Sequence, residues 1–69
     1  MIYITSDYIT LGQLLKLTDM IQSGGEAKIF LKTHAIFVNG EKEDRRGRKL
    51  YPQDHIKIDD QEFEIAHED

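Results

Sequence analysis

The dipeptide Asn39-Gly40 constrains the fold more than any other local feature of the chain. Asn and Gly both accept the positive φ angles that a two-residue type I′ hairpin turn requires. Ile36-Phe37-Val38, just before it, predicts a buried strand, and Glu41-Lys42-Glu43, just after it, predicts a polar return strand at a sheet edge. The sequence therefore predicts an antiparallel hairpin near the middle of the chain.

Alternation of apolar and polar residues predicts a first strand at Ile2–Thr5. Thr10 and Gln13 then form a Thr-x-x-Gln capping box, which opens a helix that ends within residues 18–21. Beyond the hairpin, Ile56-Lys57-Ile58 and Phe63-Glu64-Ile65 predict two more strands joined by a turn.

A second helix is predicted from a second capping box, in which Ser23 bonds to the backbone of the first turn and Glu26 reaches back to Ser23. This helix runs to about Thr33 and places Lys28 and Lys32 together on its exposed side. Those lysines could contact a ligand, pair with Glu26, or simply be solvated.

The predicted elements define an α+β fold in which two packed helices cover a small, mostly antiparallel sheet. We expect one domain over residues 1–69. We also expect most aromatic side chains to lie in the core, namely Tyr3, Phe30, Phe37 and Phe63. The last, acidic residues are expected to fray.

Composition predicts a soluble, intracellular, cytoplasmic protein. The chain has no cysteine, which agrees with a reducing compartment. It has no apolar run long enough to span a bilayer and no signal-peptide pattern at its N-terminus. No membrane partner is therefore expected.

Charge is distributed unevenly, although the net charge is only −4. Residues 28–49 contain seven Lys or Arg against three acidic residues, whereas residues 54–69 contain seven acidic residues against one Lys. Because charges are screened over roughly 8–10 Å, a ligand senses the local patch more than the total.

The loop at residues 44–49 is the first candidate for a binding site. Arg45, Arg46, Arg48 and Lys49 could contact phosphates, with Gly47 allowing close backbone approach. The same charges could also belong to a solvated loop that balances the acidic end of the chain. Tyr51, next to this loop, is a candidate for stacking on a base.

The ordered set of motifs resembles the small RNA-binding module named after ribosomal protein S-four, also called the alpha-L RNA-binding motif. The resemblance covers about residues 8–65, and the short length and the basic loop are most similar to its stand-alone, YaaA-type bacterial subgroup. The matching residues are Leu14-Leu15, Ser23, Glu26-Ala27-Lys28, Val38-Asn39-Gly40 and Asp54-His55-Ile56.

This chain departs from the family pattern at four places. Thr10-Leu11-Gly12 replaces Arg-Leu-Asp, and Ser23-Gly24 replaces Ser-Arg, so two cations are absent. His34 stands where a helix-terminal Gly is common, and Gln53-Asp54 replaces a Gly-Asp corner. The arginines of the loop could compensate for the lost cations.

Enzymatic and metal chemistry find little support in the sequence. No P-loop, dinucleotide fingerprint or nucleophile–base motif is present. His34, His55 and His67 do not have metal-ligand spacing, and His34 fits the C-terminus of a helix. We expect no catalytic residue, no metal, no cofactor and no small-molecule substrate.

The resemblance implies a non-enzymatic, monomeric RNA-binding protein that grips structured RNA, with ribosomal RNA or the ribosome as partner and ribosome assembly or translation as its setting. An alternative is a protein-interaction adaptor that uses Asp59, Asp60, Glu62 and Glu64 to bind a basic, ribosomal protein. The predicted RNA-binding residues are Ser23, Lys28, Lys32, Asn39, Arg45, Arg46, Arg48 and Lys49.

Overall fold

The computed structural model describes residues 1–68, which form two helices and seven short strands. In chain order, these elements are β1 (Ile2–Ile4), β2 (Ile9–Thr10), α1 (Leu11–Leu17), α2 (Gly24–Thr33), β3 (Ile36–Val38), β4 (Glu41–Lys42), β5 (Lys49–Leu50), β6 (His55–Ile58) and β7 (Gln61–His67). No helix among these residues is long and apolar enough to cross a membrane.

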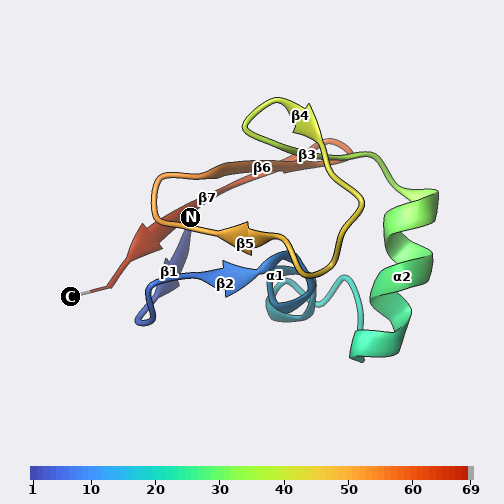
Figure 1. Ribbon diagram of the computed structural model, residues 1–69, viewed down its shortest axis with the longest axis horizontal. Helices are drawn as coiled ribbons and strands as arrows, with labels where there is room; N and C mark the ends of the chain where they lie inside the picture. The colour runs from blue at the N-terminus through green and yellow to red at the C-terminus, as the bar shows by residue number, and fades with distance from the viewer. Residues whose placement is uncertain (69) are drawn as a thin grey trace.

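Five of the strands form one sheet, in the order β1-β7-β6-β3-β4. Only the β1–β7 pair in it is parallel; the other neighbours are antiparallel. In Figure 1, α2 stands at one end of this sheet, while α1 lies along its lower side beside the β2–β5 pair. The predicted α+β fold, with two helices and a mostly antiparallel sheet, is confirmed.

The central hairpin forms as predicted. Asn39 and Gly40 have φ angles of 52° and 86°, so both residues of the turn lie in the left-handed region that a type I′ turn uses. β3 pairs with β4 on one side and with β6 on the other, which makes it an interior strand. Its end residues, Ile36 and Val38, point to the same face of the sheet and are fully buried in the core.

The capping box at the start of α1 is also confirmed. The Gln13 amide donates to the Thr10 hydroxyl at 3.2 Å, and the Thr10 amide donates to Gln13 Oε1 at 2.7 Å. The helix ends at Leu17, one residue before the predicted range of 18–21, and Thr18 is its C-cap. Leu11, Leu14 and Leu15 share its buried face and are fully enclosed.

The second capping box is wrong in its details. Ser23 is the N-cap of α2, but its side chain makes no capping hydrogen bond. The Glu26 amide, which a capping serine would take, donates instead to the backbone carbonyl of Ser23 at 3.1 Å. The first turn is thus closed by backbone alone, and the helix still spans the predicted residues to Thr33.

The core is aliphatic rather than aromatic. Phe30 and Phe63 pack against it from its margin, and Phe37 is half-buried. Tyr3, expected in the core, is 62% exposed, because Ile2 and Ile4 on either side of it take the inward positions of a period-two strand. The residues that fill the centre are Leu11, Leu14, Leu15, Ala27, Ile36, Val38, Leu50, Ile56, Ile58 and Ile65.

A second sheet, which the sequence did not predict, joins β2 to β5. Ile9 pairs with Leu50 and Thr10 pairs with Lys49, so the end of the basic loop lies against the start of α1. Two-residue strands carry too little periodicity to be recognised in a sequence. This pairing fixes the position of the C-terminal end of the basic loop, which leads into β5.

At the end of the chain, the Glu68 amide donates to the Ile4 carbonyl at 2.7 Å, so residue 68 is tied to the sheet rather than frayed. Asp69, to which the predicted fraying also applied, lies outside the described residues.

Candidate nucleic-acid interface

Glu43 organises the basic loop between β4 and β5. Its side chain is only 5% exposed. One carboxylate oxygen accepts hydrogen bonds from the backbone amides of Asp44 and Arg45, both at 3.0 Å. The same carboxylate binds Arg45 through Nε and Nη2 at 3.0 and 3.1 Å, and Arg48 through Nη1 at 2.8 Å. The loop is therefore wound around one buried negative charge.

The electrostatics of this cluster favour the charged forms of Glu43 and Arg45. Hydrogen bonding to Arg45, assisted by Arg48, lowers the pKa of Glu43 from 4.5 to about 2, even though burial acts in the opposite direction. Reciprocally, Glu43 raises the pKa of Arg45. Because Arg45 remains 71% exposed, its guanidinium meets the solvent while two of its nitrogens hold the carboxylate.

The backbone of the loop is fastened to the N-terminus of α1. The Leu11 amide donates to the Arg48 carbonyl at 2.8 Å, and the Gly12 amide donates to the Arg46 carbonyl at 2.9 Å. A Cβ atom at Gly12 would lie 3.4 Å from that Arg46 oxygen, so the loop passes as close as contact allows. Loop carbonyls thus satisfy amides that a helix start otherwise leaves unpaired.

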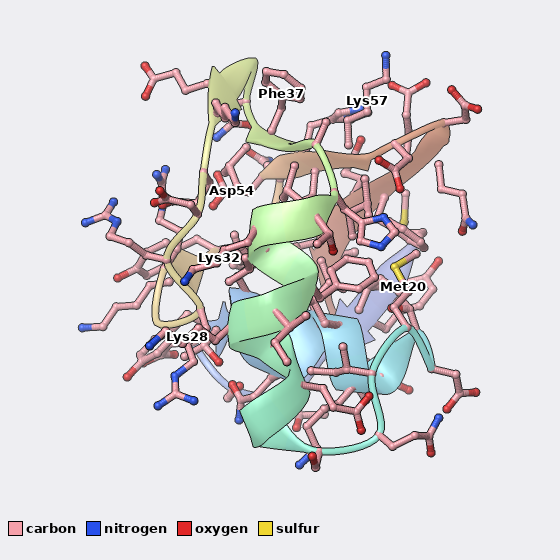
Figure 2. The ribbon with its side chains drawn as sticks, turned by 90° about the vertical axis from the view of Figure 1, so that its right-hand side faces the viewer. Met20, Lys28, Lys32, Phe37, Asp54 and Lys57 are labelled. Carbon is pink, nitrogen blue, oxygen red and sulfur yellow. The ribbon has the colours of Figure 1, made fainter. Side chains whose placement is uncertain are left out.

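Arg46 connects the loop to the other helix. Its Nη1 donates to the Gly24 carbonyl, in the first turn of α2, at 3.3 Å. Figure 2 shows Lys28 and Lys32 projecting from α2 toward the side where the β4–β5 loop passes, while Lys57 lies on the other side. The two lysines and the loop consequently share one side of the molecule.

Lys28 and Lys32 are exposed, and neither side chain makes a hydrogen bond or an ion pair within residues 1–68. Pairing with Glu26, one of the alternatives considered from the sequence, does not occur there. We call the surface formed by these lysines and the loop the cationic face; its members are Lys28, Lys32, Arg45, Arg46, Arg48 and Lys49.

Lys49, at the end of the loop, lies over an aromatic ring. Its Nζ is 4.9 Å from the centroid of the Tyr8 ring, and the Tyr8 and Tyr51 centroids are 5.7 Å apart. An open groove of about 620 Å³ runs along this part of the surface. It is lined by Arg45, Gly47, Arg48, Lys49, Tyr51 and Asp54.

Asn39 differs from the cationic contact residues because it is uncharged and both the nitrogen and the oxygen of its side-chain amide bond to other residues of the fold. Its amide nitrogen donates to Asp54 Oδ1 at 3.1 Å, and its amide oxygen accepts from the His55 backbone at 2.9 Å. The Asn of Val-Asn-Gly thereby joins the Asp of Asp-His-Ile. Asn39 thus connects the hairpin to the corner that precedes β6.

Ser23, by contrast, has an exposed side chain that makes no hydrogen bond within the described residues. It lies one residue before Gly24, whose carbonyl accepts from Arg46, so it is at the margin of the cationic face. Its hydroxyl therefore remains accessible to a ligand.

Four acidic side chains, Asp59, Asp60, Glu62 and Glu64, lie on the β6–β7 hairpin, and two of them are paired with histidines. His34 Nδ1 lies 2.6 Å from Asp59 Oδ2, and His55 Nε2 lies 2.8 Å from Glu62 Oε1. The bond to His34 and a backbone bond from Ala35 lower the pKa of Asp59. His34 is the C-cap of α2, as predicted.

Within residues 1–68 there is no group of three or more His, Cys, Asp or Glu side chains that could hold a metal ion. The imidazoles of His34 and His55 each face a single carboxylate.

Of the eight predicted contact residues, six come together on the cationic face, Ser23 lies at its margin, and Asn39 serves the fold. The residue that sequence reasoning missed is Glu43, which it assigned to an exposed strand edge. The available signal was the spacing Glu43-x-Arg45-x-x-Arg48, an acid among arginines, but no periodic pattern shows that such an acid is buried.

Fold and site together define a small α+β domain that displays a preorganised cationic loop beside a helix. The chain belongs to the S4 domain family: the family model described as "S4 domain" matches residues 2–66. This is the RNA-binding family that the ordered motifs resembled.

Among curated proteins, the chain is 57% identical over 58 residues to "Probable ribosome maturation protein RlbA" of Bacillus subtilis (strain 168). The match covers 84% of this chain and 82% of that relative. No solved structure matches the chain significantly.

Proposed function

We propose that this protein binds structured RNA, specifically ribosomal RNA, through the cationic face and acts without catalysis in ribosome maturation. The observation that carries the proposal is the loop around Glu43, which holds Arg45 and Arg48 in place on the same side as the two unpaired lysines of α2. Membership of the S4 domain family and the similarity to a ribosome maturation protein support it.

The proposed mechanism is electrostatic. Phosphates that meet Lys and Arg release condensed counterions, so affinity falls as salt rises. Arg45 suits this role, because its Nη1 has no partner within the described residues while Nε and Nη2 hold Glu43. A guanidinium fixed in this way loses little conformational freedom when it meets a phosphate. The protein would act as a monomer in the cytoplasm, where ribosomes are assembled.

The test is a salt titration of binding to ribosomal RNA fragments. With four to six phosphate contacts, log Kd against log salt should have a slope of magnitude about 3 to 5. The double variant Lys28→Ala/Lys32→Ala should reduce that magnitude by about 2, one for each lost contact. Neither lysine has a partner in the fold, so this variant should unfold at the same temperature as the parent.

Lys57→Ala is the control, because it removes the same kind of charge from an exposed position away from the cationic face. It should leave the slope unchanged. A slope near zero for the parent protein, or equal slopes for the parent and the double variant, would contradict the proposal.

The competing adaptor hypothesis places the partner on the acidic hairpin. The pairing of Asp59 and Glu62 with histidines reduces the charge that this hairpin offers to a basic protein when those histidines are protonated. Retention of ribosome association by a variant of the cationic face, together with its loss on neutralising the acids, would favour the adaptor.

A further inference from the structure

The groove beside the loop contains an aromatic surface that phosphate binding does not use. Tyr51 is 47% exposed and lines the groove together with Arg45, Arg48 and Lys49. Its volume of about 620 Å³ falls within the ~300–1,000 Å³ typical of small-molecule sites. A phosphate is bound by cations and does not require an aromatic ring. The exposed ring of Tyr51 is suited instead to a flat ligand group that can stack on it.

The backbone of Tyr51 is held firmly in this position. Its amide donates to Asp54 Oδ2 at 2.8 Å, and its carbonyl accepts from the Asp54 amide at 3.0 Å. The other oxygen of Asp54 accepts from Asn39. Both carboxylate oxygens of Asp54, the one acid that lines the groove, therefore accept hydrogen bonds from other residues of the fold. The three cations that line the groove outnumber it, so a ligand meets a net positive charge.

Tyr8 supports Tyr51 from the side. The two rings are 5.7 Å apart and inclined at 47°, and Lys49 lies over Tyr8. This tilted pair leaves nearly half of Tyr51 uncovered within a cationic groove. An aromatic ring exposed beside arginines is the arrangement by which proteins stack a nucleobase and hold its phosphate at the same time.

We propose that Tyr51 is a base-stacking residue: it receives one unpaired RNA base in the groove while Arg45, Arg48 and Lys49 hold the flanking phosphates. The proposal rests on the proposed function and narrows it, since the preferred RNA would carry a bulged or looped-out nucleotide rather than a continuous duplex. Fully paired RNA keeps its bases stacked inside the helix, where Tyr51 cannot reach them.

A purely structural role of Tyr51 makes a different prediction. If the ring only covers the β2–β5 pair, then Tyr51→Leu should alter folding stability. Its affinity should then fall by the same factor for every RNA, or for none. The two roles are therefore separated by comparing RNAs rather than by affinity for one RNA.

The experiment uses two RNA hairpins of equal length, one with a single bulged adenosine and one fully paired. Tyr51→Leu should weaken binding of the bulged hairpin about tenfold and leave the paired hairpin unchanged, because base–aromatic stacking is lost only in the first. Tyr51→Phe, which keeps the ring, should recover most of the affinity. An equal loss of affinity for both hairpins, or no loss for either, would overturn the proposal that Tyr51 stacks on a base.

A second readout follows from the absence of tryptophan in the chain. Tyr51→Trp introduces a single indole, whose fluorescence should be quenched by the bulged hairpin and not by the paired one. Adenosine monophosphate forms the free-nucleotide arm; if it quenches at the same concentration as the bulged hairpin, the site is a mononucleotide site and the proposal is wrong. Failure of the parent protein to bind the ribosomal RNA fragments would overturn the proposed function, whereas binding of those fragments without binding of the bulged hairpin would overturn the base site alone.

Discussion

Glu43 is the residue on which the geometry of the cationic face depends. Three residues direct five donor atoms at its carboxylate, two from the backbone and three from guanidinium groups. A buried carboxylate in this setting is stable only because all these bonds form together. The carboxylate of Glu43 thus fixes the positions of the Arg45 and Arg48 guanidinium groups.

We therefore expect Glu43→Gln to lower the free energy of unfolding by about 2 kcal/mol, or ~10 °C in Tm for a domain of this size. The neutral amide accepts more weakly and adds donors that face guanidinium groups. Chemical and thermal denaturation measure the loss. Glu41→Gln, on the exposed strand next to it, is the matched control and should change stability by less than about 0.5 kcal/mol.

The same substitution should change the response to acid. The pKa of Glu43 is lowered from 4.5 to about 2, so its contribution is fully present above pH 4.5 and is lost as the pH falls toward 2. A shift of that size corresponds to about 3 kcal/mol. The parent and the Glu43→Gln variant should therefore converge in stability between pH 4.5 and pH 2; a constant difference across that range would show that the charge of Glu43 is not what matters.

At the scale of elements, the β3–β4 hairpin is joined to the corner before β6 by Asn39. The Asn39 side chain bonds to Asp54 and to the His55 amide, and its own amide donates to the His55 carbonyl at 2.7 Å. The Val-Asn-Gly motif accordingly does more than turn the chain. It ties the hairpin turn to the corner before β6, whose Asp54 lines the groove.

Asn39→Gly keeps the turn and removes the side-chain bonds to Asp54 and His55, because glycine accepts the φ of 52° but has no side-chain amide. We expect a loss of about 1–2 kcal/mol in the free energy of unfolding, from the two missing hydrogen bonds. RNA affinity, measured well below Tm, should match that of the parent. A loss of affinity at an unchanged salt slope would instead identify Asn39 as a direct contact, as the sequence had suggested, because a neutral amide releases no counterion when it meets a phosphate.

Sequence reasoning succeeded where a short local pattern carries the whole signal. Thr10-x-x-Gln13 and Asn39-Gly40 specify their cap and turn through residues that touch one another. Ser23-x-x-Glu26 has the same form, but the Ser23 carbonyl takes the amide that its hydroxyl would need. A capping-box motif therefore shows which groups can bond, but it does not determine whether the hydroxyl or the carbonyl of the serine accepts the hydrogen bond.

The features that the sequence did not reveal depend on distant segments. Glu43 is buried because the loop folds back over it and onto the start of α1, which adjoins the β2–β5 pair. Gln53, where the family has a glycine, still adopts a φ of 80°. The amide of Gln53 donates to the Ile65 carbonyl, so pairing with β7 holds a conformation that its own residue type disfavours.

At the scale of the whole molecule, the two signs of charge are concentrated on different elements. Six of the nine Lys and Arg residues form the cationic face, on α2 and the basic loop, whereas Asp59, Asp60, Glu62 and Glu64 lie on the β6–β7 hairpin. A polyanion approaching the molecule is attracted by one group and repelled by the other, which orients the encounter and acts mainly on the rate of association.

The double variant Asp60→Asn/Glu64→Gln tests this separation, since neither side chain has a partner within the described residues. We expect RNA affinity to rise a few-fold at low salt, through faster association, because long-range repulsion is removed. The gain should disappear in ~1 M salt, where the Debye length is about 3 Å. Weaker ribosome association by this variant would instead support the adaptor hypothesis.

The parallel pairing of β1 with β7 has a kinetic consequence. Ile2 lies opposite Ile65, so this part of the sheet forms only when segments from opposite ends of the described chain meet. Closing so large a loop costs entropy before any contact repays it, which slows folding relative to a helical bundle of equal length. The helices and the central hairpin can assemble from neighbouring segments, whereas β1 must wait for β7. We infer that docking of β1 is a late event in folding and that its release is an early event in unfolding.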